Sequence, residues 1–222
     1  MSNANRSSPA HPTGKSPVVI AIAGPSCSGK TELAHRLCAA LKEHRPALFP
    51  FDGYYLDLAH LPMDEITRHN FDSPGSLDES LLKMHLRTLA RGGSVERPCY
   101  DYATHRRTGT QRLDPGELLI AEGLFALYWE DLLPLYAMRI YVDLDDAACL
   151  KRRQARDERE RGASPEFTLW QWAAHVKPMA DAHIRPTLCR ADLVLDGAAP
   201  LGEIAARAAR HILPLLPPPP VI

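Results

Sequence analysis

Cysteine is scarce in this 222-residue chain, and its few copies are scattered. They are odd in number and include no C-x-x-C pair, which excludes a disulfide framework and a thiolate zinc site: Cys27, Cys38, Cys99, Cys149 and Cys189. An excess of charge of one sign is also missing, since 26 basic and 27 acidic residues leave a formal charge of −1. A nucleic-acid or membrane partner is therefore not expected.

Long apolar runs are absent as well. No stretch approaches the roughly 18 residues of a membrane span, and residues 1–16 lack the apolar centre of a signal peptide. Together with the unpaired cysteines, this predicts a protein of the reduced cytoplasm.

The composition is that of one folded domain. A hydrophobic content of 45% over 222 residues can bury the core of a single α/β unit, which we expect to span residues 17–213. The polar segment 1–16 is expected to be disordered. Residues 214–222 are expected to form a proline-rich, non-helical tail.

Near-continuous apolar runs predict parallel strands that are buried on both faces. The expected strands are residues 18–23, 47–52, 118–123, 138–144 and 191–197. Helical patterns lie between them, at residues 31–44, 76–93 and 145–162. Asp78 is expected to cap the second helix and Asp143 the third. This alternation predicts a parallel sheet of about five strands with helices on both faces.

A phosphate-binding motif follows the first strand directly. It reads G-x-x-x-x-G-K-T and comprises Gly24, Pro25, Ser26, Cys27, Ser28, Gly29, Lys30 and Thr31. The glycines let backbone N–H groups close around phosphate oxygens, while the helix that begins near Gly29 presents its positive end. Lys30 is expected to reach the β and γ phosphates, and the Thr31 hydroxyl to ligate Mg²⁺. The order of strand, motif and helix therefore predicts a P-loop NTPase-type fold.

Two carboxylates end other strands, Asp52 the second and Glu122 the third. Ligands of parallel α/β sheets bind at these strand ends, where a carboxylate can accept a hydroxyl proton or help to hold Mg²⁺. Position alone leaves Asp52 equally suited to a turn before Gly53. No guanine-reading N-K-x-D motif is present, which argues against a GTPase.

Eight stretches between about Val18 and Gly197 resemble the uridine–cytidine kinases of the phosphoribulokinase/uridine kinase family. They are GPSCSGKT, DGYYLDL, NFDSPGSLD, PCYDYATHRR, LLIAEGLFAL, RIYVDLD, RRQARDERERG and VKPMADAHIRPTLCRADLVL. The resemblance implies a small insertion on the acceptor side and an arginine-bearing lid. It further implies ATP or GTP as the phosphate donor, Mg²⁺, a small nucleoside acceptor and a homo-oligomer.

The resemblance also implies roles for single residues. Asp52 matches the base that takes the 5′-hydroxyl proton, and Thr31, Asp52 and Glu122 match the magnesium-side residues. Arg156 and Arg161 look like lid arginines facing the transferring phosphate. The residues that look like the acceptor site are Asp72, Arg153 and Gln171 for the ribose, and Tyr55, Tyr100, Tyr102 and His105 for the base.

Three positions depart from the family pattern. Ala163 replaces a usual arginine, Ser73 a common histidine, and Gly53 a common serine or cysteine. Our hypothesis is a kinase for the 5′-hydroxyl of uridine or cytidine, which would serve pyrimidine salvage. The alternatives are a related kinase with another acceptor, such as a phosphoribulokinase- or pantothenate-kinase-like enzyme, and a module that binds nucleotide without turnover.

Overall fold

The computed structural model describes residues 16–218. The expected disordered segment 1–16 thus lies outside the described residues except for Ser16, as does the end of the proline-rich tail. Within the described part of that tail, a 3₁₀ turn, η8 (Leu213–Leu215), continues two residues past the expected boundary at 213. Pro214 permits this because a proline in the first turn of a helix needs no N–H partner.

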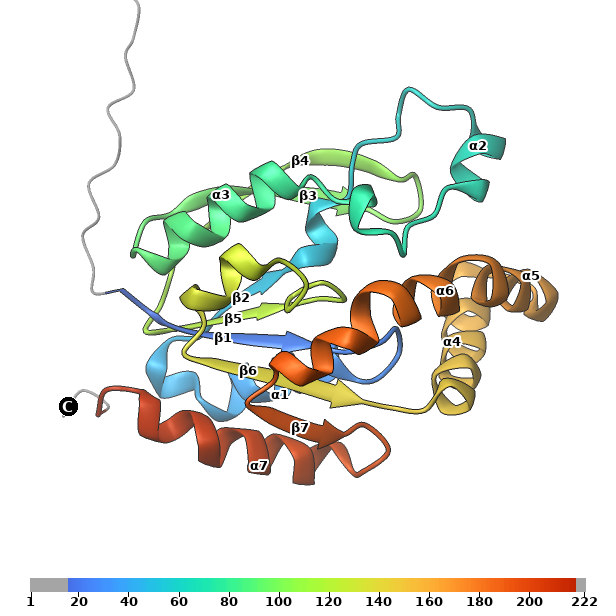
Figure 1. Ribbon diagram of the computed structural model, residues 1–222. Helices are drawn as coiled ribbons and strands as arrows, with labels where there is room; N and C mark the ends of the chain where they lie inside the picture. Colours follow the sequence, from blue (N-terminus) through green and yellow to red (C-terminus); the bar gives the residue numbers. More distant parts are fainter. Residues whose placement is uncertain (1–15, 219–222) are drawn as a thin grey trace, which may run out of the picture.

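Five parallel strands form the central sheet in the order β2-β5-β1-β6-β7 (Figure 1). Their bounds are β1 (Val18–Ala23), β2 (Ala47–Pro50), β5 (Leu118–Glu122), β6 (Met138–Asp143) and β7 (Leu193–Asp196). Each expected strand is present. The sheet with its flanking helices confirms the fold class.

Alternate side chains of β1 enter two separate cores. Val19, Ala21 and Ala23 pack on the face that α3 (Glu79–Ala90) covers. Ile20 and Ile22 pack on the opposite face, against α1 (Lys30–Ala40) and α7 (Leu201–Ile212). Because both faces are buried, the strand reads as a continuous apolar run rather than an alternating one.

Aspartate side chains cap the amino ends of α3 and α4 (Asp146–Arg161), but the residue that caps the second of these helices is not the predicted one. Asp78 caps α3 by accepting a hydrogen bond from the Leu81 N–H at 3.1 Å. For α4 the cap is Asp145, which accepts from the Ala148 N–H at 2.9 Å. Our expectation of Asp143 was wrong, because that residue is still the last of β6.

Several elements that the apolar pattern did not reveal surround the carboxyl ends of the strands. They are the hairpin β3 (Val95–Asp101) and β4 (Arg106–Leu113), α2 (Met63–Arg68), α5 (Pro165–Gln171) and α6 (Lys177–Met179). The π-helical turn η5 (Trp172–Val176) joins α5 to α6, and a second π-helical turn, η6 (Ala180–Ile184), continues the run after α6. The 3₁₀ turns are η1 (Lys42–His44), η2 (Phe51–Tyr54), η3 (Pro74–Ser76), η4 (Glu130–Leu135) and η7 (Arg185–Arg190).

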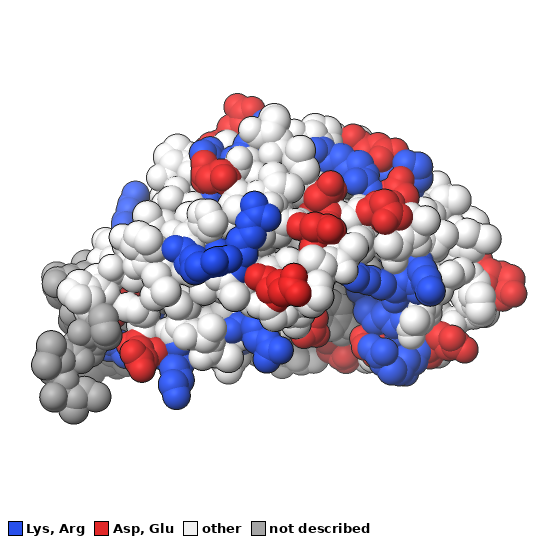
Figure 2. All heavy atoms as spheres, turned by 90° about the horizontal axis from the view of Figure 1, so that it is seen from below, with Lys and Arg blue, Asp and Glu red and all other residues white. Residues whose placement is uncertain are grey.

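The surface carries charge of both signs. Figure 2 shows Lys and Arg interspersed with Asp and Glu on one face of the molecule, in keeping with the balanced composition. Among residues 16–218, no helix is long and apolar enough to cross a bilayer.

Gly197, just after β7, is pressed against the phosphate loop. A Cβ here would lie 2.6 Å from the carbonyl oxygen of Ser28 and 2.9 Å from that of Asp143. We therefore expect Gly197→Ala to displace the loop, cost about 1–3 kcal/mol of folding free energy and weaken nucleotide binding. Urea unfolding and calorimetric titration with ADP measure both effects.

Gly202 provides the matched control. It lies in α7, and an added Cβ there would meet no atom within 4 Å. Gly202→Ala is expected to leave ADP affinity unchanged and to raise stability by a few tenths to 1 kcal/mol. Equal effects of the two substitutions would contradict the steric argument.

Candidate active site

The phosphate loop Gly24–Thr31 lies between β1 and α1, where the sequence places it. Gly24 and Gly29 have φ of 151° and 102°, and Cys27 has φ of 63°, so the loop uses left-handed backbone repeatedly. A Cβ at position 24 would collide with the carbonyl oxygen of Val142. Lys30 begins α1 and is buried. The loop thus has the compact shape that leaves backbone N–H groups for phosphate oxygens.

Two carboxylates lie beside this loop. Glu122 ends β5 and is 3% exposed, and its Oε2 accepts a hydrogen bond from the Thr31 hydroxyl at 3.1 Å. Asp52 lies half-buried in η2, directly after the neighbouring strand β2. Burial and the nearby Asp52 charge raise the pKa of Glu122 to about 7, against the opposing effects of Lys30 and the Thr31 hydrogen bond. Burial likewise raises the pKa of Asp52.

The two carboxylates and the Thr31 hydroxyl fit a Mg²⁺ site. Within residues 16–218 no three His, Cys, Asp or Glu side chains gather into a metal-binding group. Magnesium does not need one, because it binds through one or two carboxylates together with substrate phosphates and water. A divalent cation would also offset the repulsion from neighbouring carboxylates, Asp72 for Asp52 and Asp52 for Glu122, which adds to the effect of burial in raising the pKa of each acid.

Arg153 of α4 connects the phosphate loop with Asp72 and Gln171. It is 6% exposed, and its Nη1 donates to the Ser26 hydroxyl at 3.1 Å and lies 3.7 Å from Asp72. Its Nη2 donates to the Gln171 side-chain carbonyl at 3.5 Å. The structure therefore brings together Asp72, Arg153 and Gln171, which come from three distant segments of the chain.

Arg156 and Arg161 lie further along the same helix and at its end. Both are near enough to Asp52 for their charges to lower its pKa, against the stronger effect of burial. Both also contact the carboxylate of Asp157, at 3.0 and 3.4 Å. Two cations at the end of α4 thus lie near enough to the Asp52 carboxylate to affect it electrostatically.

Aromatic side chains form a further cluster, which includes Tyr55 and Tyr102, two residues that the Asp52 charge affects. The rings of Phe71 and His105 stack with their centroids 4.5 Å apart and an interplanar angle of 20°. The Tyr55 ring packs edge-on against Phe71, with ring centroids 5.7 Å apart, and lies beside Tyr100, with ring centroids 5.4 Å apart. Tyr102 contacts Tyr100 at 5.3 Å and is 49% exposed. Tyr55 also belongs to the buried core, so the cluster extends from the core at Tyr55 to the exposed Tyr102.

The charges of nearby carboxylates contribute to the pKa values of tyrosines in this cluster. The pKa of Tyr55 lies well above its usual range because of burial and the Asp52 and Asp72 charges. The pKa of Tyr102 is raised by burial and by Asp52 and Glu122. His105 has the left-handed φ of 54°, and burial and Arg161 lower its pKa. Tyr55 and Tyr102 thus lie near enough to the carboxylates of Asp52, Asp72 or Glu122 for the carboxylate charges to affect them.

Comparisons with known proteins show the family to which this chain belongs. The model of the phosphoribulokinase / uridine kinase family matches residues 19–200. The chain belongs to this family. A uridine kinase from Chloroflexus aurantiacus is 39% identical over 182 residues, which cover 82% of this chain and 87% of that protein. A uridine kinase from Staphylococcus aureus strain JH9 is 40% identical over 82% of this chain and 88% of its own length.

Solved structures support the fold. The phosphoribulokinase from Rhodobacter spheroides superposes with a TM-score of 0.60 at 15% identity, covering 85% of this chain and 75% of that one. As a member of the phosphoribulokinase/uridine kinase family, the protein is a P-loop kinase, a phosphotransferase that acts on a hydroxyl acceptor.

The three departures from the family pattern have visible local surroundings. Ser73 caps η3, with its hydroxyl accepting from the Gly75 N–H at 3.3 Å. Gly53 lies close to β3, where a Cβ would be 3.5 Å from the Pro98 carbonyl oxygen. Ala163 follows the end of α4 and donates its N–H to the Asp157 carbonyl at 3.1 Å. Gly53 and Ser73 thus lie on segments next to Asp52 and Asp72, and Ala163 lies just beyond α4.

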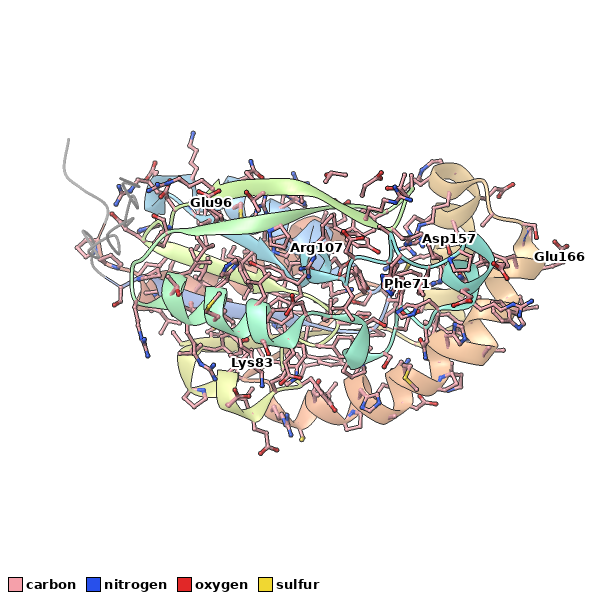
Figure 3. The ribbon with its side chains drawn as sticks, turned by 90° about the horizontal axis from the view of Figure 1, so that it is seen from above. Phe71, Lys83, Glu96, Arg107, Asp157 and Glu166 are labelled. Atoms are coloured by element: carbon pink, nitrogen blue, oxygen red, sulfur yellow. The ribbon has the colours of Figure 1, made fainter. Side chains whose placement is uncertain are left out.

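Sequence reasoning missed Phe71 and Arg107. Phe71 directly precedes Asp72 in NFDSP, so its position was the available signal. Arg107 of β4 donates to the carbonyls of Tyr54 and Tyr55 at 3.2 and 3.0 Å and to Asp78 at 3.1 Å, which holds Tyr55 in place. Figure 3 labels both residues, Phe71 in the segment after α2 and Arg107 in β4.

A cavity of about 220 Å³ lies on the outer side of the phosphate loop. It is lined by Ser28, Gly29, Glu32, Arg152, Gly197, Ala199, Leu201 and Ile204. Arg152 crosses it, donating to the Gly197 carbonyl at 2.9 Å. A recess lined by both polar and apolar side chains thus lies beside the phosphate loop.

Proposed function

We propose that the protein transfers the γ-phosphoryl group of ATP or GTP to the 5′-hydroxyl of uridine or cytidine, within pyrimidine salvage. The observation that carries this proposal is the Asp52–Glu122 carboxylate pair, which adjoins the phosphate loop on one side and the aromatic cluster on the other. The relatives named uridine kinase support the choice of acceptor.

On the donor side, Lys30 and the loop amides neutralise phosphate charge. Thr31, Asp52 and Glu122 would hold Mg²⁺, which when bound supplies further positive charge to the phosphate oxygens. Arg156 and Arg161 stabilise the charge on the transferring group. These residues position the donor for in-line transfer.

Asp52 orients the acceptor hydroxyl and accepts its proton. Its burial-raised pKa makes it a stronger base than an exposed aspartate, and the charges of Lys30, Arg156 and Arg161 favour its ionised form against that effect of burial. A general base at this place raises the nucleophilicity of the hydroxyl oxygen as the phosphoryl group moves. The protein thereby catalyses the transfer through a single proton acceptor.

Two sets of residues hold the acceptor, one at its ribose and one at its base. Asp72, Arg153 and Gln171 offer a carboxylate, a guanidinium and an amide, which pair well with ribose hydroxyls. The rings of Tyr55, Phe71, Tyr100, Tyr102 and His105 offer flat faces and polar edges to a pyrimidine base.

An ADP-release assay with Mg-ATP or Mg-GTP and a panel of acceptors tests the proposal. The panel contains uridine, cytidine, adenosine, pantothenate and ribulose 5-phosphate. Turnover with uridine or cytidine alone is the expected result. Turnover with another acceptor would overturn the base-pocket assignment, and intact nucleotide with every acceptor would favour a binding module.

Phe71→Ala tests the aromatic cluster separately. Because one base–aromatic stack contributes about 1–3 kcal/mol, we expect the KM for the nucleoside to rise by about 10- to 100-fold with a smaller change in kcat. Phe167→Ala is the control, since Phe167 stacks on Trp170 in α5, outside the cluster. Similar KM values for wild type and Phe71→Ala would remove Phe71 from the acceptor site.

A further inference from the structure

Asp157 is a buried carboxylate at the centre of three arginines of α4. It lies in the last turns of α4, and its side chain is 1% exposed. Its Oδ2 is 3.3 Å from Arg153 Nε, and its Oδ1 is 3.0 Å from Arg156 Nη2 and 3.4 Å from Arg161 Nη1. Both oxygens are therefore used, and each contact is to a different guanidinium.

Helix geometry makes this arrangement possible. Arg153 and Arg161 stand four residues before and after Asp157, so all three share one face of α4, while Arg156 reaches the same carboxylate from the adjacent position. The backbone carbonyl of Asp157 closes the helix by accepting from the N–H groups of Gly162 and Ala163. The residue is thus anchored through both main chain and side chain.

The charges explain why the carboxylate is buried here. Three guanidiniums in one place repel one another, and a single anion at their centre compensates part of that repulsion before any phosphate is bound. The partners have N–H groups to spare, because a guanidinium carries five donors. Arg156 and Arg161 can therefore contact phosphate oxygens without leaving Asp157.

Two of the three arginines also connect to opposite sides of the site. Arg153 contacts the Ser26 hydroxyl of the phosphate loop and lies beside Asp72. Arg161 acts electrostatically on Asp52 and His105. Figure 3 places Asp157 on the same side of the molecule as Phe71, near α2 and α4. A shift of Asp157 would accordingly move groups on the donor and acceptor sides together.

We propose that Asp157 is a positioning residue for phosphoryl transfer, which acts by holding Arg153, Arg156 and Arg161 in their working arrangement. It contacts no substrate in this role. The inference deepens the proposed function, because it assigns what organises the lid of that same site.

The first test compares Asp157→Asn with wild type. We expect kcat to fall by about 10²-fold, the loss typical of misplaced catalytic groups, with the Kd for ADP changed by less than about threefold. Glu79→Gln is the matched control, since Glu79 forms an exposed i,i+4 pair with Lys83 in α3. Wild-type kcat in Asp157→Asn would overturn the proposal.

A double-mutant cycle distinguishes positioning from general support of the fold. If Asp157 acts through the arginines, Asp157→Asn combined with Arg161→Ala should be little slower than Arg161→Ala alone. Independent losses that multiply would assign Asp157 a structural role instead. Asp157→Glu keeps the charge, so it covers the case in which the asparagine variant does not fold, and we expect it to lose about tenfold in kcat.

A binding readout keeps the test separate from the identity of the acceptor. Calorimetry with ADP and with a non-hydrolysable ATP analogue needs no nucleoside. We expect wild type to prefer the analogue and Asp157→Asn to lose most of that preference, because the lid arginines contact the γ phosphate. An unchanged preference would overturn the inference even if uridine is phosphorylated, whereas a lost preference would support it even if no acceptor in the panel turns over.

Discussion

Asp52→Asn is expected to lower kcat by about 10³-fold, the middle of the range that a general base contributes. The substitution keeps the size of the side chain but removes the atom that accepts the hydroxyl proton. The Kd for ADP should stay within a few-fold, because Lys30 and the loop glycines that hold the phosphates are untouched. Single-turnover rates and calorimetric titration separate the two effects.

Asp57→Asn is the control for this experiment. Asp57 lies five residues further on, exposed, where its carboxylate accepts from the Ala59 N–H at 2.8 Å. We expect kcat within twofold of wild type for Asp57→Asn. Near-normal turnover of Asp52→Asn would show that Asp52 is not the base, and that Arg156, Arg161 and Lys30 carry the reaction by charge alone.

Glu122→Gln is expected to abolish most activity and at the same time to stabilise the metal-free fold. The pKa of Glu122 is raised from about 4.5 to about 7 by burial and by Asp52. Native protein therefore binds the proton more tightly than unfolded protein. The resulting stabilisation is complete below about pH 4.5 and is lost as pH rises through 7. At pH 8 the difference amounts to about 3 kcal/mol.

Glutamine removes this dependence because it does not ionise. Urea unfolding in EDTA at pH 5 and pH 8 should show Glu122→Gln gaining on wild type by about 2–3 kcal/mol between the two pH values. Glu96→Gln on the exposed side of β3 should show no such gain. A wild type that keeps its stability up to pH 8 would contradict the buried, proton-binding state of Glu122.

The local parts of this protein could be predicted from its sequence. The phosphate loop needs only neighbouring residues, and β1 is recognisable because both of its faces are buried. The hairpin β3–β4 was missed because β4 is mostly exposed and polar, with no apolar face to reveal its period. Asp143 was mistaken for a cap because the chain has acids at 143, 145 and 146, and only the end of β6 decides among them.

The contacts between distant residues could not be predicted in the same way. Arg153 meets Ser26 across 127 positions of sequence, and Arg107 meets Tyr55 across 52. Asp157 resembles any acid on a charged helix until its burial is known. Family resemblance supplied Arg153, Asp72 and Gln171 as a group, whereas the residues that hold this group in place became visible only in three dimensions.

The position of Arg153 has a consequence for how the binding of one ligand affects the affinity for the other. One guanidinium contacts the phosphate loop through Ser26 and lies beside Asp72 and Gln171 on the acceptor side. A donor nucleotide that draws Arg153 toward its phosphates changes how Asp72 and Gln171 are paired, and hence the affinity for the nucleoside. Linkage requires the reciprocal effect to have the same magnitude. Under the proposed function, the two substrates would therefore be thermodynamically coupled through the Arg153 side chain before any phosphate is transferred.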